Sequence, residues 1–287
     1  MDWQKGERSR NVEVDSGRGG GGGFGFGGGR GLGIGGLIVL AILGWVFFKD
    51  PTALLDQGGT AGPTAPVSEP AQVDPQQRDF VSAILGSTEK TWGDIFAAGG
   101  RQYTDPRLDL FSGGVRTACG LASTAVGPFY CPGDEKVYLD LSFFRELQDR
   151  FGAAGDFARA YVIAHEVGHH VQKLLGVFDR VQQARERGAP MEGANGLSVR
   201  QELQADCFAG VWANRSEQRL HWLEAGDVEE ALNAASQIGD DTLQRESRGA
   251  VVPDSFTHGT SAQRVKWFKT GLESGKVSSC DTFSGDI

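Results

Sequence analysis

The segment FARAYVIAHEVGHHVQ, from Phe157 to Gln172, constrains the fold and the chemistry more than any other part of the chain. Its centre has the pattern HExxH, formed by His165, Glu166 and His169. On a helix of about 3.6 residues per turn, side chains four apart share one face, so the two imidazoles can bind the same Zn²⁺ ion. Glu166 lies to one side of that face, where it can take a proton from a water at the metal. The pattern therefore predicts a helix that binds one zinc ion per chain.

The remaining positions of this helix predict a buried side. Apolar residues recur at spacings of three and four, namely Ala160, Ile163, Val167, Val171 and Leu174. Such a stripe is typical of a helix packed against a hydrophobic core. A five-residue pattern can also occur by chance on an unrelated helix, so the metal interpretation needs a second element.

That second element is the motif QELQAD. Ser198 followed by Gln201 is a capping-box pattern, which predicts a helix over about residues 199–214. Glu202 is the candidate third zinc ligand, and a set of two histidines and one glutamate leaves a position open for water. Asp206, one turn later, can hold a ligand imidazole in one tautomer. The alternative is a solvated acidic face, which is common for Glu and Asp on helices.

The 287 residues suffice for one catalytic domain preceded by an extension. The net charge is −9 at pH 7, and no basic stripe occurs in residues 76–287. Proteins that bind nucleic acid normally present such a stripe to the phosphates. We therefore expect no nucleic-acid partner, and nothing in the sequence indicates an oligomeric state.

The first third of the chain has a different composition. Residues 1–30 are charged and then rich in glycine, which predicts a disordered tail. Residues 31–48, GLGIGGLIVLAILGWVFF, contain no charge and are long enough for a transmembrane helix. A signal peptide would end in small residues, and the glycines would destabilise a buried helix of a soluble domain. Residues 49–75 are rich in Pro, Ala and Gly and are expected to be a linker to a domain at 76–287.

Charge around the apolar span predicts its orientation. Five basic residues precede it (Lys5, Arg8, Arg10, Arg18 and Arg30), whereas Lys49 is the only one between the span and Arg78. The positive-inside tendency places the N-terminal tail in the cytoplasm. We therefore expect a single-pass protein of the inner membrane, bound to the bilayer through residues 31–48, with its main domain periplasmic or extracellular.

Four cysteines are present, and none of them forms a CxxC pair. Their even number favours two disulfides in an oxidising compartment, and three pairings are possible. We predict Cys119–Cys131, which closes a local loop, and Cys207–Cys280, which pins the C-terminal tail against the Glu202 helix.

Residues 136–141 alternate in polarity and predict a short strand. Val137 and Leu139 would lie on one face, with Tyr138 and Asp140 on the other. An edge strand at this place could pair with an extended peptide substrate through Tyr138, Leu139 and Asp140. The alternative is a plain core strand.

Four runs together resemble a known family: VGPFYCPGDEKVYLDLSFF, YVIAHEVGHHVQ, QELQADCFAG and HGTSAQRVKWF. The resemblance is to the bacterial neutral zinc metallopeptidases and covers roughly residues 75–285. More distantly, the chain is similar to the membrane-bound prenyl-processing zinc proteases. The resemblance implies a mainly helical, zincin-like α+β fold with zinc on His165, His169 and Glu202. It implies hydrolysis of a peptide or protein substrate, but no particular substrate.

The fourth of these runs predicts one more functional group. Thr260 and Gln263 form a capping pattern, so a helix is expected from here towards Gly271. His258 precedes that helix and is our candidate donor to the oxyanion that develops during amide hydrolysis. Arg264 would orient His258 or bind a substrate carboxylate. The alternative is that His258 only caps a loop.

Metal-assisted peptide hydrolysis with Glu166 as general base is the function that these predictions favour. One rival is a non-catalytic envelope protein that binds zinc and acts as an interaction module. Glu166 counts against it, because a structural zinc site needs no base beside an open position. Another rival is a partner-binding module with an accidental HExxH pattern.

Overall fold

A computed structural model describes residues 1–15, 73–123, 127–140, 142–149 and 155–287 of the chain. The expected span at 31–48 lies outside these residues, as do the predicted tail beyond residue 15 and the linker up to residue 72. Among the described helices, none combines the length and the apolar character that a bilayer crossing requires.

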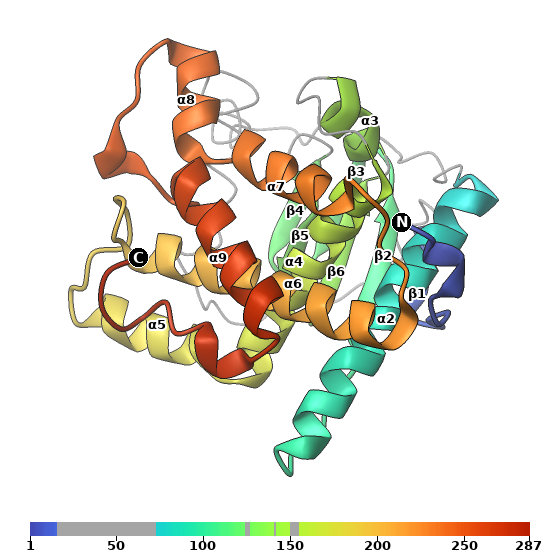
Figure 1. The fold of residues 1–287 in the computed structure, drawn as a ribbon. Helices are drawn as coiled ribbons and strands as arrows, with labels where there is room; N and C mark the ends of the chain where they lie inside the picture. The colour runs from blue at the N-terminus through green and yellow to red at the C-terminus, as the bar shows by residue number, and fades with distance from the viewer. Residues whose placement is uncertain (16–72, 124–126, 141, 150–154) are drawn as a thin grey trace, which may run out of the picture.

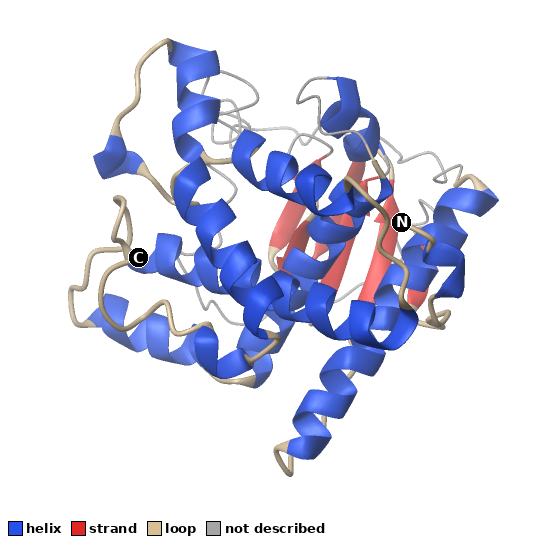
Figure 2. Ribbon diagram, in the orientation of Figure 1, coloured by secondary structure: helices blue, strands red, loops and turns tan. Residues whose placement is uncertain are grey.

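The fold is a mainly helical α+β arrangement, as predicted (Figures 1 and 2). The helices are α2 (Pro75–Ala98), α3 (Ser142–Asp149), α4 (Asp156–Leu174), α5 (Val177–Glu186), α6 (Leu197–Leu220), α7 (Asp227–Gln237), α8 (Asp240–Arg248) and α9 (Ser261–Ser274). The strands are β1 (Val12–Val14), β2 (Arg107–Phe111), β3 (Gly114–Thr117), β4 (Gly120–Ser123), β5 (Phe129–Cys131) and β6 (Lys136–Asp140). Short 3₁₀ turns are η1 (Trp3–Lys5), η3 (Pro253–Ser255) and η4 (Val277–Ser279).

Four strands form one sheet in the order β1-β2-β6-β5. β1, β2 and β6 run parallel, whereas β5 is antiparallel to β6. β3 and β4 form a separate antiparallel hairpin. Val137 and Leu139 of β6 belong to the main core, and Tyr138 packs with the cluster under the hairpin. The predicted alternation of this strand is therefore correct.

The predicted edge position of this strand is wrong. β6 is hydrogen-bonded to β2 along residues 136–140 and to β5 along residues 136–138, so it is an interior strand of the sheet. Leu139 and Asp140 lie beyond its register with β5. The Asp140 carboxylate instead accepts a hydrogen bond from the Ser142 backbone N–H at the start of α3, at 2.8 Å.

The predicted disorder of residues 1–30 is wrong for the first fifteen. Residues 12–14 form β1, which pairs in parallel with residues 108–110 of β2. Trp3 packs edge-to-face on Phe80 of α2 with ring centroids 5.6 Å apart. Gly86 is required where this segment crosses α2, because a Cβ there would lie 2.3 Å from the Glu7 carbonyl oxygen. The N-terminal segment is therefore an integral layer of the domain.

Helix α4 occupies the centre of the molecule (Figure 1). It contacts β5 and β6 of the sheet and the helices α2, α5, α6 and α7. The predicted apolar stripe faces this core, since Ala160, Ile163, Val167 and Val171 are all buried. The helix begins at Asp156 with Gly155 as its N-cap residue. The central helix is thus held on nearly all sides.

Both predicted disulfides are present. Cys119–Cys131 joins the turn between β3 and β4 to the end of β5, and Cys207–Cys280 joins α6 to the C-terminal segment. The described cysteines include no free thiol.

Candidate metal centre

His165 and His169 of α4 meet Glu202 of α6 at the centre of the structure. Their ligand atoms all lie within 4.8 Å of one another. His165 Nε2 is 3.2 Å from Glu202 Oε2, and His169 Nε2 is 3.5 Å from Glu202 Oε1. The three predicted ligands therefore come together, although they lie on two separate helices.

Small residues allow the two helices to approach this closely. Gly168 lies within the HExxH segment, and a Cβ there would lie 3.0 Å from the Ala205 carbonyl oxygen. That separation is tighter than almost all real Cβ contacts, so a larger residue would push α4 away from α6. Gly168 thus brings Glu202 within reach of the two imidazoles.

The donor atoms fit a zinc ion. Zinc sites of hydrolases use imidazole nitrogens and a carboxylate oxygen and leave one position open. In both histidines Nδ1 is engaged by another side chain, His165 by Asp206 and His169 by Gln172, so both Nε2 atoms face Glu202. The cluster can therefore hold a metal ion without rearrangement of these rings.

Asp206 is the centre of a buried polar network behind His165. Its Oδ1 lies 2.8 Å from His165 Nδ1 and accepts a hydrogen bond from the Tyr161 hydroxyl at 2.5 Å. Arg264 donates to both Asp206 oxygens at 2.9 Å. Burial opposes charge on Asp206, but Arg264 and His165 lower its pKa to about 2. Asp206 is therefore an anion that fixes the His165 ring, as predicted for it.

Arg264 acts on Asp206 in this structure and not on His258. Its donors go to Asp206, to the Tyr161 hydroxyl and to the Ile238 carbonyl, and its side chain is 3 % exposed. The predicted alternatives for Arg264, orienting His258 or binding a substrate carboxylate, are therefore not the contacts that the structure shows.

Sequence reasoning missed Tyr161 and Gln172. Tyr161 precedes His165 by four residues and Gln172 follows His169 by three, so each shares a helix face with one ligand. That spacing was the available signal. It identifies no partner by itself, because Asp206 and Gln204 come from another helix.

Glu166 lies beside the three ligands and belongs to none of their contacts. Its side chain is buried, and no described residue donates a side-chain hydrogen bond to it. Burial raises the pKa of this carboxyl, while the neighbouring His165 and His169 oppose the rise. A buried carboxylate with a raised pKa is suited to exchanging protons near neutral pH.

His258 lies on the loop before α9, where Asp240 at the start of α8 holds it. Asp240 Oδ2 accepts hydrogen bonds from the backbone N–H groups of Thr257, His258 and Gly259, at 2.7, 2.7 and 3.0 Å. Its Oδ1 is 3.3 Å from His258 Nδ1. Burial lowers the pKa of His258, but Asp240 outweighs it and the net shift is upward. The negative charge of Glu202 adds to that rise.

His170 does not join the ligand set. It is buried, with Nδ1 3.1 Å from the Tyr130 hydroxyl of β5 and Nε2 2.7 Å from the Thr104 carbonyl. It therefore fastens the central helix to the outer strand of the sheet.

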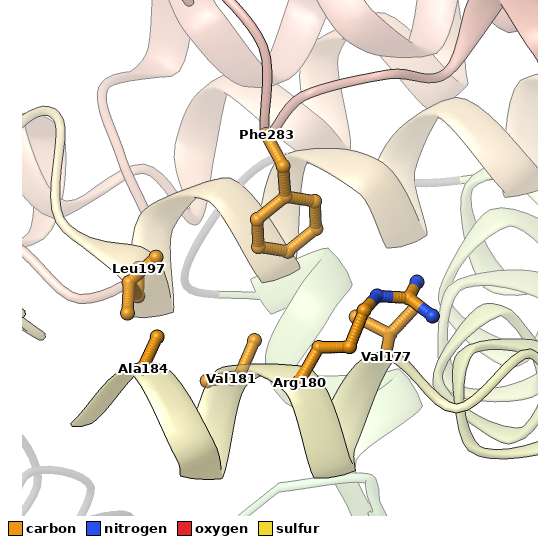
Figure 3. Close-up of a pocket in the computed structure, with 6 residues that line it drawn as sticks. All are labelled: Val177, Arg180, Val181, Ala184, Leu197 and Phe283. Carbon is orange, nitrogen blue, oxygen red and sulfur yellow. The ribbon is translucent and has the colours of Figure 1, made fainter. Parts of the chain in front are cut away.

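A separate apolar pocket of about 160 Å³ lies between α5, the start of α6 and the C-terminal tail (Figure 3). It is lined by Val177, Arg180, Val181, Ala184, Leu197 and Phe283. The Arg180 guanidinium donates to the Leu175 carbonyl at 3.0 Å. None of the six lining residues is a nucleophile or a metal ligand, so the pocket carries no chemistry of its own.

Comparison with known proteins agrees with this geometry. The family model described as "Putative neutral zinc metallopeptidase" matches residues 1–283. The chain belongs to this family. It is 50 % identical over 258 residues to the protein YpfJ of Escherichia coli K12, covering 88 % of each chain. It is 46 % identical over 214 residues to Rv2575 of Mycobacterium tuberculosis H37Rv, covering 71 % of this chain and 70 % of the relative. No solved structure matches.

Family membership confirms the resemblance found in the sequence and supports a metallopeptidase role. It also identifies zinc as the metal that the cluster of two histidines and Glu202 would hold. The individual roles of the site residues remain predictions.

Proposed function

We propose that this protein is a zinc-dependent metallopeptidase that hydrolyses peptide bonds, with Glu166 as its general base. The observation that carries the proposal is Glu166 itself, a buried carboxylate beside a ligand set that it does not join. A site that held zinc only for structure would have no use for such a group.

The side chains have distinct tasks in this proposal. His165, His169 and Glu202 would hold the metal, which supplies a Lewis acid for the scissile carbonyl and the attacking water. Glu166 takes a proton from that water as its oxygen bonds to the carbonyl carbon. The protonated Glu166 then gives the proton to the amide nitrogen as the carbon–nitrogen bond breaks. His258 donates a hydrogen bond to the carbonyl oxygen as negative charge develops there.

The substrate would lie along β5 rather than β6. Among the described strands, β5 is the sheet edge beside α4, and the Tyr130–His170 contact joins the two elements. An extended peptide can add to such an edge by backbone hydrogen bonds. We therefore propose an extended peptide or unfolded protein segment as the substrate class.

The two disulfides indicate the compartment in which the folded domain works. Disulfides persist in oxidising surroundings and are rare in the cytosol. We propose that the folded domain works in the periplasm or outside the cell, with residues 1–15 on the same side of the membrane as the rest of its sheet and residues 31–48 associated with the bilayer.

The test compares the wild-type protein with Glu166→Gln, using a peptide library and mass spectrometry to detect cleavage. We expect Glu166→Gln to keep its fold and its zinc and to lose about 10²–10⁴-fold in rate, the usual contribution of a general base. Glu229→Gln on the exposed face of α7 is the matched control and should cleave normally. Equal cleavage by zinc-loaded Glu166→Gln would refute the assignment of Glu166. A wild-type protein that binds zinc but cleaves nothing would point to the non-catalytic rival.

A further inference from the structure

The two candidate ligand histidines are held by different kinds of partner. Nδ1 of His165 faces the Asp206 carboxylate at 2.8 Å, and Nδ1 of His169 faces Gln172 Oε1 at 2.9 Å. An ionised carboxylate can only accept, so His165 must donate from Nδ1. An amide offers both a donor and an acceptor, so the effect of Gln172 depends on which end faces His169.

Backbone geometry decides the orientation of Gln172. Its Nε2 donates to the Gln201 carbonyl at 2.7 Å. A carbonyl oxygen can only accept, so the amino group must point there and Oε1 is left to face His169. The ring of His169 must therefore donate from Nδ1. In the neutral ring Nε2 then carries a lone pair and no proton, and Nε2 is the atom that faces Glu202.

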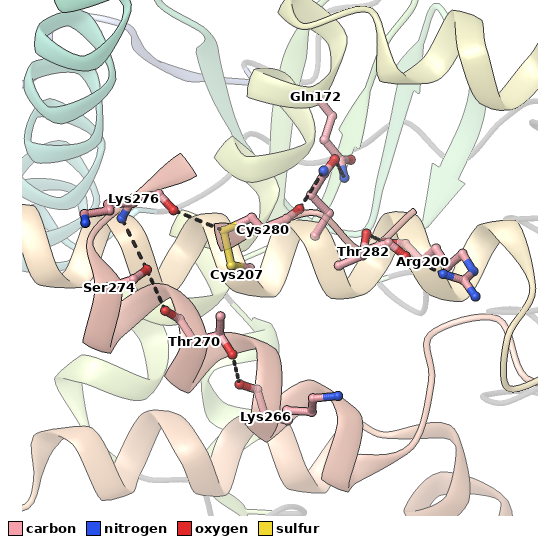
Figure 4. Close-up of a disulfide and its surroundings, with 10 residues drawn as sticks. Gln172, Arg200, Cys207, Lys266, Thr270, Ser274, Lys276, Cys280 and Thr282 are labelled. Carbon is pink, nitrogen blue, oxygen red and sulfur yellow. Dashed lines mark hydrogen bonds between the residues drawn. A yellow bond between two sulfur atoms is a disulfide. The ribbon is translucent and has the colours of Figure 1, made fainter. Parts of the chain in front are cut away.

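A second glutamine supports the same orientation. Gln172 Nε2 also donates to Gln204 Oε1 at 3.1 Å, and Gln204 Nε2 donates to the Cys280 carbonyl at 2.9 Å. That carbonyl is again a pure acceptor, so Gln204 cannot turn without losing both bonds. A disulfide joins Cys280 to Cys207 (Figure 4). Cys207 lies on α6, three residues after Gln204. The disulfide therefore holds the last acceptor of the chain of bonds in place.

Burial makes this arrangement costly to change. Gln172 is fully buried and Gln204 nearly so. A buried amide that loses a partner keeps an unsatisfied polar group away from water, so turning either side chain would be penalised. Partly broken buried networks are penalised more than intact ones.

We propose that Gln172 is a positioning residue of the metal centre. It keeps a proton on Nδ1 of His169 so that Nε2 is left for the metal, and the Gln201 and Cys280 carbonyls set its direction. The inference rests on the metal-binding part of the proposed function. Gln172 would hold the His169 ring as Asp206 holds the His165 ring, but Gln172 is an uncharged amide.

A neutral partner suits this position. Glu166, Glu202 and Asp206 already place three carboxyl groups around the two rings. A carboxylate in place of Gln172 would face the carbonyl oxygens of Gln201 and Gln204 at hydrogen-bond distance with no hydrogen to donate. Replacement by Glu should therefore weaken the site, even though a negative charge normally makes a ligand imidazole more basic.

The experiment measures the zinc dissociation constant by competition with a chromophoric chelator, and the protonated ring nitrogen of His169 by nitrogen NMR of the zinc-loaded protein. We expect Gln172→Leu and Gln172→Glu to bind zinc about 10–100-fold more weakly, the range for loss of an outer partner of a ligand. Gln182→Leu is the matched control, because Gln182 is exposed on α5 and, among the described residues, its side chain bonds only to Glu186. Its zinc affinity should equal that of the wild type.

A second arm tests the part played by the disulfide. Replacing Cys207 and Cys280 together by Ala should weaken zinc binding in the wild type but add nothing in a Gln204→Leu background. Replacing Cys119 and Cys131 together by Ala is the control and should leave zinc affinity unchanged. Equal weakening by the two disulfide removals would show general loosening and would overturn the link through Gln204.

The outcomes separate the two proposals. A well-folded wild-type protein that binds no zinc refutes the proposed function. A wild-type protein that binds zinc while Gln172→Glu binds it equally well or better, with the same ring nitrogen protonated, overturns the role of Gln172. Circular dichroism on each variant identifies any that has not folded, and the Leu and Glu replacements are then judged separately.

Discussion

Proton binding competes with metal binding at the two candidate ligand histidines. Burial favours the neutral ring of His165, but Asp206 and Glu202 outweigh it and raise its pKa to about 10. The pKa of His169 is also raised, because Glu202 outweighs burial there. Without metal, the His165 ring therefore holds a second proton near neutral pH, and the raised pKa of His169 favours a second proton there too. Zinc binds neutral imidazole, so that proton must leave.

Zinc affinity should consequently rise with pH. Below the raised pKa values protons compete with zinc, and each displaced proton changes the dissociation constant about tenfold per pH unit. We expect a steep decrease of the dissociation constant between about pH 6 and pH 8. Titration calorimetry in two buffers of different ionisation enthalpy would count the released protons. A dissociation constant independent of pH would show that the rings are already neutral.

His258 provides the residue-level test of catalysis. Asp240 fixes its backbone and its Nδ1. No described residue bonds to its Nε2, which can donate to a substrate oxygen when the ring carries both protons, and the raised pKa of His258 favours that form. We expect His258→Ala to lower kcat by about 10²–10³, the scale for one oxyanion donor, with unchanged zinc content. His221→Ala is the control, since the His221 side chain is 82 % exposed. A wild-type rate in His258→Ala would mean that His258 only orders its loop.

At the scale of elements, α6 and α9 pack backbone against backbone. A Cβ on Gly271 would lie 1.9 Å from the Cys207 carbonyl oxygen, and one on Gly210 would lie 2.1 Å from the Phe268 carbonyl oxygen. Both contacted atoms are backbone oxygens, which cannot turn away as a side chain could. This close approach also brings Arg264 of α9 to Asp206 of α6.

Gly271→Ala should therefore destabilise the domain by about 1–3 kcal/mol or more, the usual cost of overpacking. Gly93→Ala is the matched control, because Gly93 lies in α2 with nothing within 4 Å of a Cβ. Helix propensity predicts that this control gains about 0.5–1 kcal/mol. Chemical denaturation measures both, and equal stability of the two variants would contradict the packing argument.

The sequence predicted those elements whose signals are local. The apolar stripe and the HExxH spacing identified α4, and the Thr260–Gln263 capping box that starts α9 is present. The predicted capping box at Ser198 does not form, because α6 begins at Leu197 with Gly196 as its N-cap residue. Strand order depends on partners far away in the chain, which explains the wrong edge position of β6.

The same distinction applies to the site. His165, His169 and Glu202 could be identified because each lies in a motif whose spacing carries the chemistry. Tyr161, Gln172 and Asp240 act through hydrogen bonds across 45, 32 and 18 residues of sequence. No spacing within one helix encodes such contacts, so they appear only after the helices have packed.

At the scale of the whole molecule, β1 supplies part of the sheet from the far end of the chain. Val12 is buried on β1, whereas Val14 on the same strand is 37 % exposed. Val12→Asp should lower the free energy of unfolding by several kcal/mol, because it buries an unpaired charge. Val14→Asp is the matched control and should change it by about 0.5 kcal/mol or less. Thermal unfolding compares them, and equal melting temperatures would show that β1 contributes nothing to stability.

The pairing of β1 with β2 limits how this chain can be arranged at a membrane. The partners come from residues 12–14 and 108–110, and strands of one sheet must occupy the same compartment. A chain that crossed a bilayer once between residues 15 and 73 would leave β1 in the cytoplasm and β2 outside. Such a single crossing and the complete sheet exclude each other. Export of the folded domain thus means either that residues 1–15 are exported with it, or that β2 becomes an open edge and the exported domain is a structurally different molecule.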